Sequence, residues 1–159
     1  MYIATAREGI LSYSIGTSEV DQVLSSCEII FGIAYDSIYD KIYWSTDYKI
    51  YRGSRSIGEV EIVLSTSQCK STFRYSSPLS SNRDQLSLYI LNLLADSLFY
   101  NLDFDWIAGN LYVATWGGYI LACDTNPTRP FRCATILTGR GNVVQITLNP
   151  NEGYVSEVR

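Results

Sequence analysis

Short runs of apolar, aromatic and β-branched residues, separated by turn residues, recur along most of this chain. Runs of about four to eight such residues are typical of β-strands, and a fully apolar run indicates a strand covered on both faces. The pattern predicts strands over 1–15 (two strands, the second starting near Gly9), 20–24, 29–36, 41–46, 49–53, 60–64, 119–125, 131–137 and 143–148, with a strand, turn and strand over 102–112 and a last strand from Tyr154.

The runs also repeat. A four-residue pattern that ends in Asp or Asn occurs as Ile33–Asp36, Leu102–Asp105 and Ile146–Asn149. Tyr43 and Tyr112 follow the first two copies at the same distance, seven residues after the Asp. Internal repeats of this kind indicate a string of similar structural units.

The spacing of the copies gives the size of the unit. Tyr2 and Tyr43 are 41 residues apart, and Asp105 and Asn149 are 44 apart. A four-stranded propeller blade takes about 40–45 residues. We therefore predict an all-β fold, an incomplete β-propeller of about three to three and a half blades, each a four-stranded antiparallel sheet.

One interval, the 69 residues from Asp36 to Asp105, exceeds the step and predicts an irregular or helical insertion near 65–100. Residues 65–84 are rich in Ser, and Leu86, Tyr89, Ile90, Leu93, Leu94 and Leu98 follow at helical spacing. The insertion is interpreted as a partner-binding helix, as a helix that covers an exposed edge, or as residues foreign to the fold, such as a translated intron. The third interpretation is favoured because deleting about 27 residues restores the step.

Two segments carry a resemblance to a known family. Lys41–Asp47 and Asp105–Tyr112 resemble the YWTD (class B) repeats of the low-density lipoprotein receptor family, and Asn149-Pro150 with Gly153 is similar to the turn before that family's next motif. The resemblance covers nearly all of 1–159 except the insertion. It implies a six-bladed propeller, here a partial one, in an extracellular receptor with neighbouring EGF-like modules.

The chain departs from the family in places. Thr46 stands where Asp is usual, Tyr112 is the only motif residue kept in its copy, and nothing in 156–159 matches. A non-functional truncated or mis-spliced product is therefore an alternative interpretation.

Six motif residues are expected to have structural roles. Large aromatic side chains pack adjacent blades together, and a buried Asp accepts hydrogen bonds from backbone N–H groups. The residues are Asp36, Tyr43, Trp44, Asp105, Trp106 and Tyr112.

A ligand surface is expected on loops at one rim. Trp116 is the favoured residue because a Trp beside two glycines suits an interface, with packing on the blade as the alternative. The other candidates are Tyr48, Arg52, Arg55 and Arg129.

Cys123 and Cys133 lie at equal distances from Thr128, the centre of an expected hairpin turn. That register places them opposite each other at disulfide range. The alternative is two small buried residues. Cys27 and Cys69 complete the four cysteines, and no C-x-x-C motif is present.

The amino-acid composition excludes several kinds of functional site. The chain has no histidine, which excludes triads, histidine metal sites and a histidine pH switch. The net charge of −4 with no basic stripe argues against nucleic acid. No signal peptide is expected in this chain, and the apolar run over 86–100 is too short and polar to enter a membrane.

These observations favour a non-enzymatic extracellular module for ligand binding, endocytosis or signalling, without a cofactor. Its expected partners are a protein ligand or an EGF-like neighbour, and the remaining propeller blades, without which the isolated chain is expected to aggregate. The alternative is a calcium-dependent propeller hydrolase, although the acidic residues are scattered: Glu19, Glu28, Glu59, Glu61, Asp103, Asp105 and Glu152.

Overall fold

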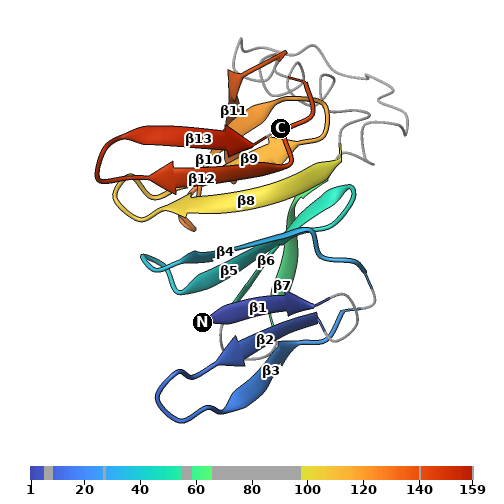
Figure 1. Ribbon diagram of the computed structural model, residues 1–159, viewed down its shortest axis with the longest axis vertical. Helices are drawn as coiled ribbons and strands as arrows, with labels where there is room; N and C mark the ends of the chain where they lie inside the picture. Colours follow the sequence, from blue (N-terminus) through green and yellow to red (C-terminus); the bar gives the residue numbers. More distant parts are fainter. Residues whose placement is uncertain (6–8, 27, 55–58, 66–97, 140, 159) are drawn as a thin grey trace.

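A computed structural model describes all of residues 1–159 except 6–8, 27, 55–58, 66–97, 140 and 159. The described residues form thirteen strands and no helix (Figure 1). The strands are β1 (Tyr2–Thr5), β2 (Gly9–Tyr13), β3 (Val20–Leu24), β4 (Gly32–Asp36), β5 (Lys41–Ser45), β6 (Lys49–Ser54), β7 (Val60–Ser65), β8 (Phe99–Asp105), β9 (Asn110–Thr115), β10 (Ile120–Asp124), β11 (Arg132–Leu137), β12 (Gln145–Asn149) and β13 (Tyr154–Val158).

The strands form four antiparallel sheets in chain order. The orders are β1-β2-β3, β4-β5-β6-β7, β8-β9-β10-β11 and β12-β13. Strand β8 contacts β4 on one side and β12 on the other, and the sheets follow one another in a row with β1–β3 at one end and β12–β13 at the other (Figure 1). This is the arrangement of propeller blades, and the predicted fold class is confirmed.

The register repeats between sheets more closely than the sequence does. A bulge follows an isoleucine at the same point of β2, β6 and β10, namely Ile10, Ile50 and Ile120. Each isoleucine pairs with a leucine on the next strand: Leu24, Leu64 and Leu137. Because a bulge fixes register and twist, the three strands that carry it, β2, β6 and β10, are structural equivalents.

This equivalence assigns each strand a position in its blade. Strand β1 precedes the bulged strand β2, as β5 precedes β6 and β9 precedes β10. Strand β1 is thus a second strand, in agreement with the sequence likeness of Tyr2–Thr5 to Tyr112–Thr115. In the last sheet, β12 corresponds to the first strands β4 and β8, and β13 to the second strands.

The turns between first and second strands share one backbone conformation. Residues four positions after Asp36, Asp105 and Asn149 have positive φ, with values of 52° for Asp40 and 71° for both Gly109 and Gly153. Positive φ is tolerated by glycine and, less readily, by Asp. The repeat at these turns therefore specifies backbone shape as well as side chains.

Hydrophobic clusters fill the spaces between sheets. The cluster between the second and third sheets contains Ala34, Tyr43, Ile50, Phe99, Leu102, Phe104, Leu111, Val113, Leu121 and Cys123. The cluster between the first and second sheets contains Ile10, Ile42 and Trp44. The cluster between the third and fourth sheets contains Ala114, Ile120, Val143 and Ile146. Strands alternate their side chains between these clusters because successive residues point to opposite faces.

The boundaries of the predicted insertion need correction. Ser65 ends β7, and Phe99 and Tyr100 belong to β8. Phe99 is fully buried in the blade core and pairs with Thr115, so it belongs to the sheet and lies outside the insertion. Residues 66–97, with the predicted helical segment except Leu98, lie outside the described residues.

Candidate ligand-binding surface

Tyr43 and Trp44 lie on opposite faces of β5 and join three sheets. Tyr43 is fully buried with its ring centroid 6.1 Å from that of Phe131, which directly precedes β11 of the third sheet. Trp44 is 4% exposed, belongs to the cluster with Ile10 of the first sheet, and stacks on Tyr51 at 5.4 Å. Both side chains pack between blades and are unavailable to a ligand. Tyr112, on β9, is half-buried against the cluster of Ala114 and Ile120.

The Tyr43 hydroxyl is a polar group inside this apolar packing. It is buried and has no hydrogen-bond partner among the described residues. Burial raises the pKa of Tyr43, and the nearby Arg52 guanidinium opposes the rise. The hydroxyl therefore stays neutral at physiological pH and contributes little to the packing.

Asp36 and Asp105 cap equivalent turns. Asp36 Oδ1 accepts hydrogen bonds from the backbone N–H groups of Ile38 and Tyr39 at 2.9 and 3.0 Å. Asp105 Oδ1 accepts from Ile107 and Ala108 at 2.8 and 3.0 Å. A carboxylate that binds two N–H groups holds its turn in one conformation.

Replacing Asp36 with alanine is expected to lower the free energy of unfolding by about 1–3 kcal/mol, because the buried carboxylate is lost and two partly buried N–H groups lose their acceptor. Asp36→Asn keeps Oδ1, and the chain itself uses Asn149 at the equivalent position, so we expect a loss below about 1 kcal/mol. Urea denaturation measures both. Equal losses for the two variants would contradict the capping role.

Trp106 does not pack between blades as the sequence analysis expected. Its side chain is 52% exposed, because it is the first residue of the β8–β9 turn, outside the pleat that buries alternate strand residues. Ile107 beside it is 61% exposed. Trp106 is therefore a surface residue and not blade packing.

The neighbouring β4–β5 turn presents an equivalent pair. Ile38 and Tyr39 are 48% and 36% exposed. Ile38 Cδ1 lies 3.4 Å from the point where a Cβ on Gly109 would stand, so the two turns touch. We call Ile38, Tyr39, Trp106 and Ile107 the turn surface. Of these four residues, the sequence analysis assigned only Trp106 to the scaffold, although a residue directly after a turn-capping Asp has no strand face to pack on.

Trp116 and Tyr48 lie in the β9–β10 and β5–β6 loops, at the ends of the strands opposite to the turn surface. The backbone N–H of Trp116 donates to Leu98, and that of Phe99 donates to Asp47 beside Tyr48. The rings of Phe31, Tyr100 and Trp116 form a row with centroid separations of 5.3 and 5.4 Å. Trp116 is 41% exposed, so it is partly packed on the blade and partly accessible.

The predicted arginines do not join this group. Arg52 Nε donates to Glu61 at 2.7 Å from within β6, and its side chain is mostly buried, so it is not a loop residue. Arg129 pairs with Asp124 at 3.5 Å in the β10–β11 loop, at the turn end of the sheet. Arg55 lies outside the described residues. The single rim expected from the sequence is therefore wrong, because successive hairpin loops alternate between the two ends of a sheet.

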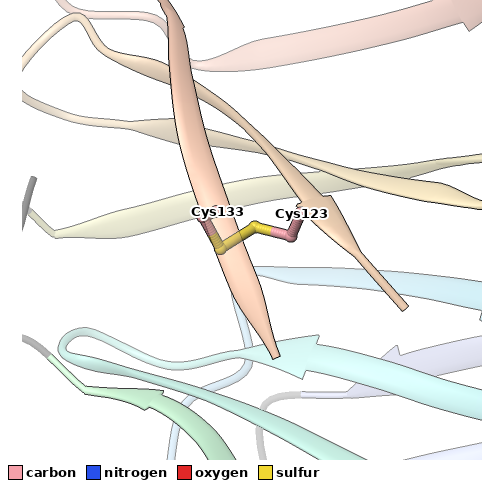
Figure 2. The surroundings of a disulfide bond; sticks show 2 residues. All are labelled: Cys123 and Cys133. Atoms are coloured by element: carbon pink, nitrogen blue, oxygen red, sulfur yellow. A yellow bond between two sulfur atoms is a disulfide. The ribbon is translucent and has the colours of Figure 1, made fainter. Parts of the chain in front are cut away.

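Cys123 and Cys133 form a disulfide between β10 and β11 (Figure 2). They are opposite each other in the ladder, with their Cα atoms 4.0 Å apart. Cys123 is fully buried in the cluster that contains Tyr43. The bond therefore connects the outermost strand of the third sheet to the core.

Several carboxylates are already engaged by the chain itself. Asp103 accepts from the backbone N–H groups of Phe104 and Leu148, both at 2.8 Å, and so ties β8 to β12. Tyr51 and Lys49 hydrogen-bond Glu28. Burial raises the pKa of Glu28, but these two hydrogen bonds, the charge of Lys49 and a hydrogen bond from Thr46 together lower the pKa overall. Within the described ranges, no three His, Cys, Asp or Glu side chains gather as metal ligands would.

No described segment forms a helix long and apolar enough to cross a membrane.

Comparisons with known proteins identify the fold and no family. No protein family and no curated protein matches the sequence. Among solved structures, the propeller chain of a nidogen/laminin complex is similar over 98% of this chain, with 16% identity and a TM-score of 0.63. A luciferin-regenerating enzyme is similar over 89%, with 15% identity and a TM-score of 0.58.

The extracellular domain of a protein described as a hybrid two-component system of B. thetaiotaomicron is similar over 92% of this chain, with 13% identity and a TM-score of 0.54. This chain covers 51%, 40% and 17% of the three neighbours in the order given. It therefore spans about half of the first and less of the others. The similarities support a β-propeller fold.

Proposed function

We propose that this chain is a non-enzymatic binding module of an extracellular, lipoprotein-receptor-like protein, and that its turn surface contacts a protein ligand. The observation that carries the proposal is the pairing of exposed apolar side chains on two adjacent capped turns. Ile38 and Tyr39 follow Asp36, and Trp106 and Ile107 follow Asp105. Contiguous exposed apolar groups mark interaction sites, and Trp and Tyr are enriched at binding hot spots.

The rigidity of the turns supports a binding role. The turn backbone is fixed by the carboxylate caps and, at the β8–β9 turn, by a 2.8 Å bond from Gly109 N–H to the Asp105 carbonyl. A surface ordered before binding loses little conformational entropy when the ligand arrives. Exposed aromatic side chains on such a surface therefore favour affinity.

The disulfide supports the extracellular assignment. Disulfides persist in oxidising compartments and are rare in the reducing cytosol. The Cys123–Cys133 bond thus suits a secreted protein or the outer part of a receptor.

The engaged carboxylates support a binding module over an enzyme. Asp36 and Asp105 would serve a hydrolase poorly as calcium ligands, because one oxygen of each is held by two backbone N–H groups. A calcium-dependent hydrolase needs oxygen ligands that converge on one point, and the carboxylates described above are distributed over separate turns and loops.

Combined replacement of Trp106 and Ile107 by alanine tests the proposal. Immobilised chain is exposed to extracellular fluid, and the retained proteins are quantified by mass spectrometry. We expect the ligand to be retained at least about tenfold less by the double variant, since truncating a hot-spot aromatic costs more than about 1–2 kcal/mol. Trp116→Ala is the matched control and is expected to retain the ligand. Identical retained proteins for all three chains would contradict the assignment of the turn surface.

A further inference from the structure

A small pocket lies between the first and second sheets, beside the hydrophobic cluster that contains Ile10, Ile42 and Trp44. Its volume is about 220 Å³, and its lining comes from β2 and β3 on one side and from β5, β6 and β7 on the other. The three cluster side chains belong to this lining and are at most 4% exposed. The pocket therefore extends from the surface to the buried core between two blades.

The repeat explains why a pocket forms at this place. Gly53 of β6 and Cys123 of β10 are equivalent, because each lies three positions after the isoleucine at the bulge. Their partners on the next strand, Val60 and Cys133, are equivalent as well. Between the second and third sheets, the disulfide joins these two positions and Phe131 packs against the same cluster. The second sheet has a glycine and a half-exposed valine instead, so less side-chain volume fills the space towards the first sheet.

Trp44 gives the pocket an aromatic wall. A Cβ on Gly53 would stand 3.0 and 3.1 Å from Cζ3 and Cη2 of Trp44, so the six-membered part of the indole lies directly over the glycine. The ring also stacks on Tyr51, with the centroids 5.4 Å apart. This contact holds the indole in place. Aromatic rings attract one another in offset and edge-to-face arrangements, so the wall favours an aromatic occupant.

The polar residues of the pocket belong to its rim. Ser25 and Glu59 are exposed, and Val60 beside them is 48% exposed. Among the described residues that line the pocket, Glu59 alone is charged. A carboxylate attracts a cation and repels an anion. The lining therefore matches a molecule with an apolar ring at one end and a positive charge at the other.

We propose that this pocket binds a small aromatic amine, with its ring against Trp44 and Gly53 and its ammonium group beside the Glu59 carboxylate. The size is suitable, since an apolar cavity of about 150 Å³ is enough to bind benzene. The larger volume here accommodates a phenyl ring with a short chain. Burial of the ring removes apolar surface of the ligand and of the pocket from water. The site shares no residue with the turn surface and does not rest on the proposed function.

Titration of the full chain with phenethylamine, followed by NMR, tests the proposal. We expect the Gly53 amide and the Trp44 indole N–H signals to shift with a dissociation constant of about 0.1–1 mM, which is ordinary for a ligand of this size. The indole signals of Trp106 and Trp116 are internal controls that should stay unchanged, because neither residue lines the pocket. The absence of shifts at Gly53 and Trp44 up to about 10 mM amine, or equal shifts of all three indoles, would overturn the proposal.

A variant that fills the pocket from its rim gives the second test. Val60→Phe adds a ring where the ligand would lie and should weaken binding by about tenfold or more. Because Val60 is half-exposed, circular dichroism should stay unchanged. Ile136→Phe is the matched control, since Ile136 is 49% exposed on β11 of the third sheet, and should leave the affinity unchanged. Equal affinities of the parent and Val60→Phe chains would overturn the location of the site.

Phenylethyl alcohol, which has the same ring and chain without the charge, tests the role of Glu59. The parent chain should bind the amine about two- to fivefold more tightly than the alcohol, in keeping with an exposed ion pair, and added salt should reduce this preference. Glu59→Gln should remove the preference. Glu61→Gln is the matched control and should retain it, because Glu61 pairs with Arg52 on the other face of β7. An alcohol that binds the parent chain as tightly as the amine would overturn the proposed ligand class. Any of these failures leaves the turn-surface experiment unaffected.

Discussion

Replacing Tyr43 with alanine is expected to lower the free energy of unfolding by about 3–5 kcal/mol, the range for removal of a large buried aromatic side chain. Tyr43 is fully buried between the second and third sheets and faces Phe131. Its loss leaves a cavity where two blades meet, because the rigid sheets on either side cannot move together to fill it. Urea denaturation followed by tryptophan fluorescence measures the loss.

Two control variants separate packing from other effects. Tyr43→Phe keeps the ring and removes only a buried hydroxyl that has no hydrogen-bond partner among the described residues, so we expect its stability to equal or exceed that of the parent chain. Trp106→Ala removes a larger aromatic from a half-exposed position and should change stability by less than about 0.5 kcal/mol. A loss of several kcal/mol for Trp106→Ala, or none for Tyr43→Ala, would contradict the division between scaffold and surface drawn here.

The repeat explains why the fold could be predicted from the sequence. The copies of the Asp or Asn pattern mark turns with one backbone shape, and Tyr43 lies on the strand that follows such a turn. The likeness of Tyr2–Thr5 to Tyr112–Thr115 agrees with the second position that the register gives to the first strand. That the first sheet has only three strands in the described part of the chain did not follow from the pattern, because a sequence repeat does not show which strands pair in one sheet.

The candidate site was harder to predict because exposure depends on position within a blade. Trp44 and Trp106 are both tryptophans in repeat segments, yet one lies in a strand between two sheets and the other begins a turn. Arg52 is similar in kind to Arg129 but lies mid-strand, where Glu61 pairs with it. Residue type alone does not show which of the two tryptophans, or which of the two arginines, is buried. The distance in sequence from the capping Asp does separate the two tryptophans.

Removing the Cys123–Cys133 bond is expected to lower the free energy of unfolding by about 2–4 kcal/mol, because the closed loop restricts the unfolded chain. The cysteines are separated by ten positions, and Cys123 is fully buried. For a chain of this length the loss corresponds to a decrease of roughly 5–15 °C in the melting temperature. Thermal unfolding with and without dithiothreitol measures it, in parallel with the double variant Cys123→Ser and Cys133→Ser.

The position of the disulfide predicts which strand opens first when the bond is removed. Strand β11 is the outermost strand of its sheet and pairs only with β10 among the described strands. Without the covalent link this edge should open locally before the sheet unfolds, since edge strands have the fewest interactions to break. Hydrogen exchange at Ala134 and Thr135 should therefore accelerate more than exchange at Tyr43 on β5. The variant Cys27→Ser with Cys69→Ser retains the bond and should keep its response to dithiothreitol. If that response is lost, or if exchange accelerates equally in β5 and β11, the bond does not act by holding β11 on the sheet.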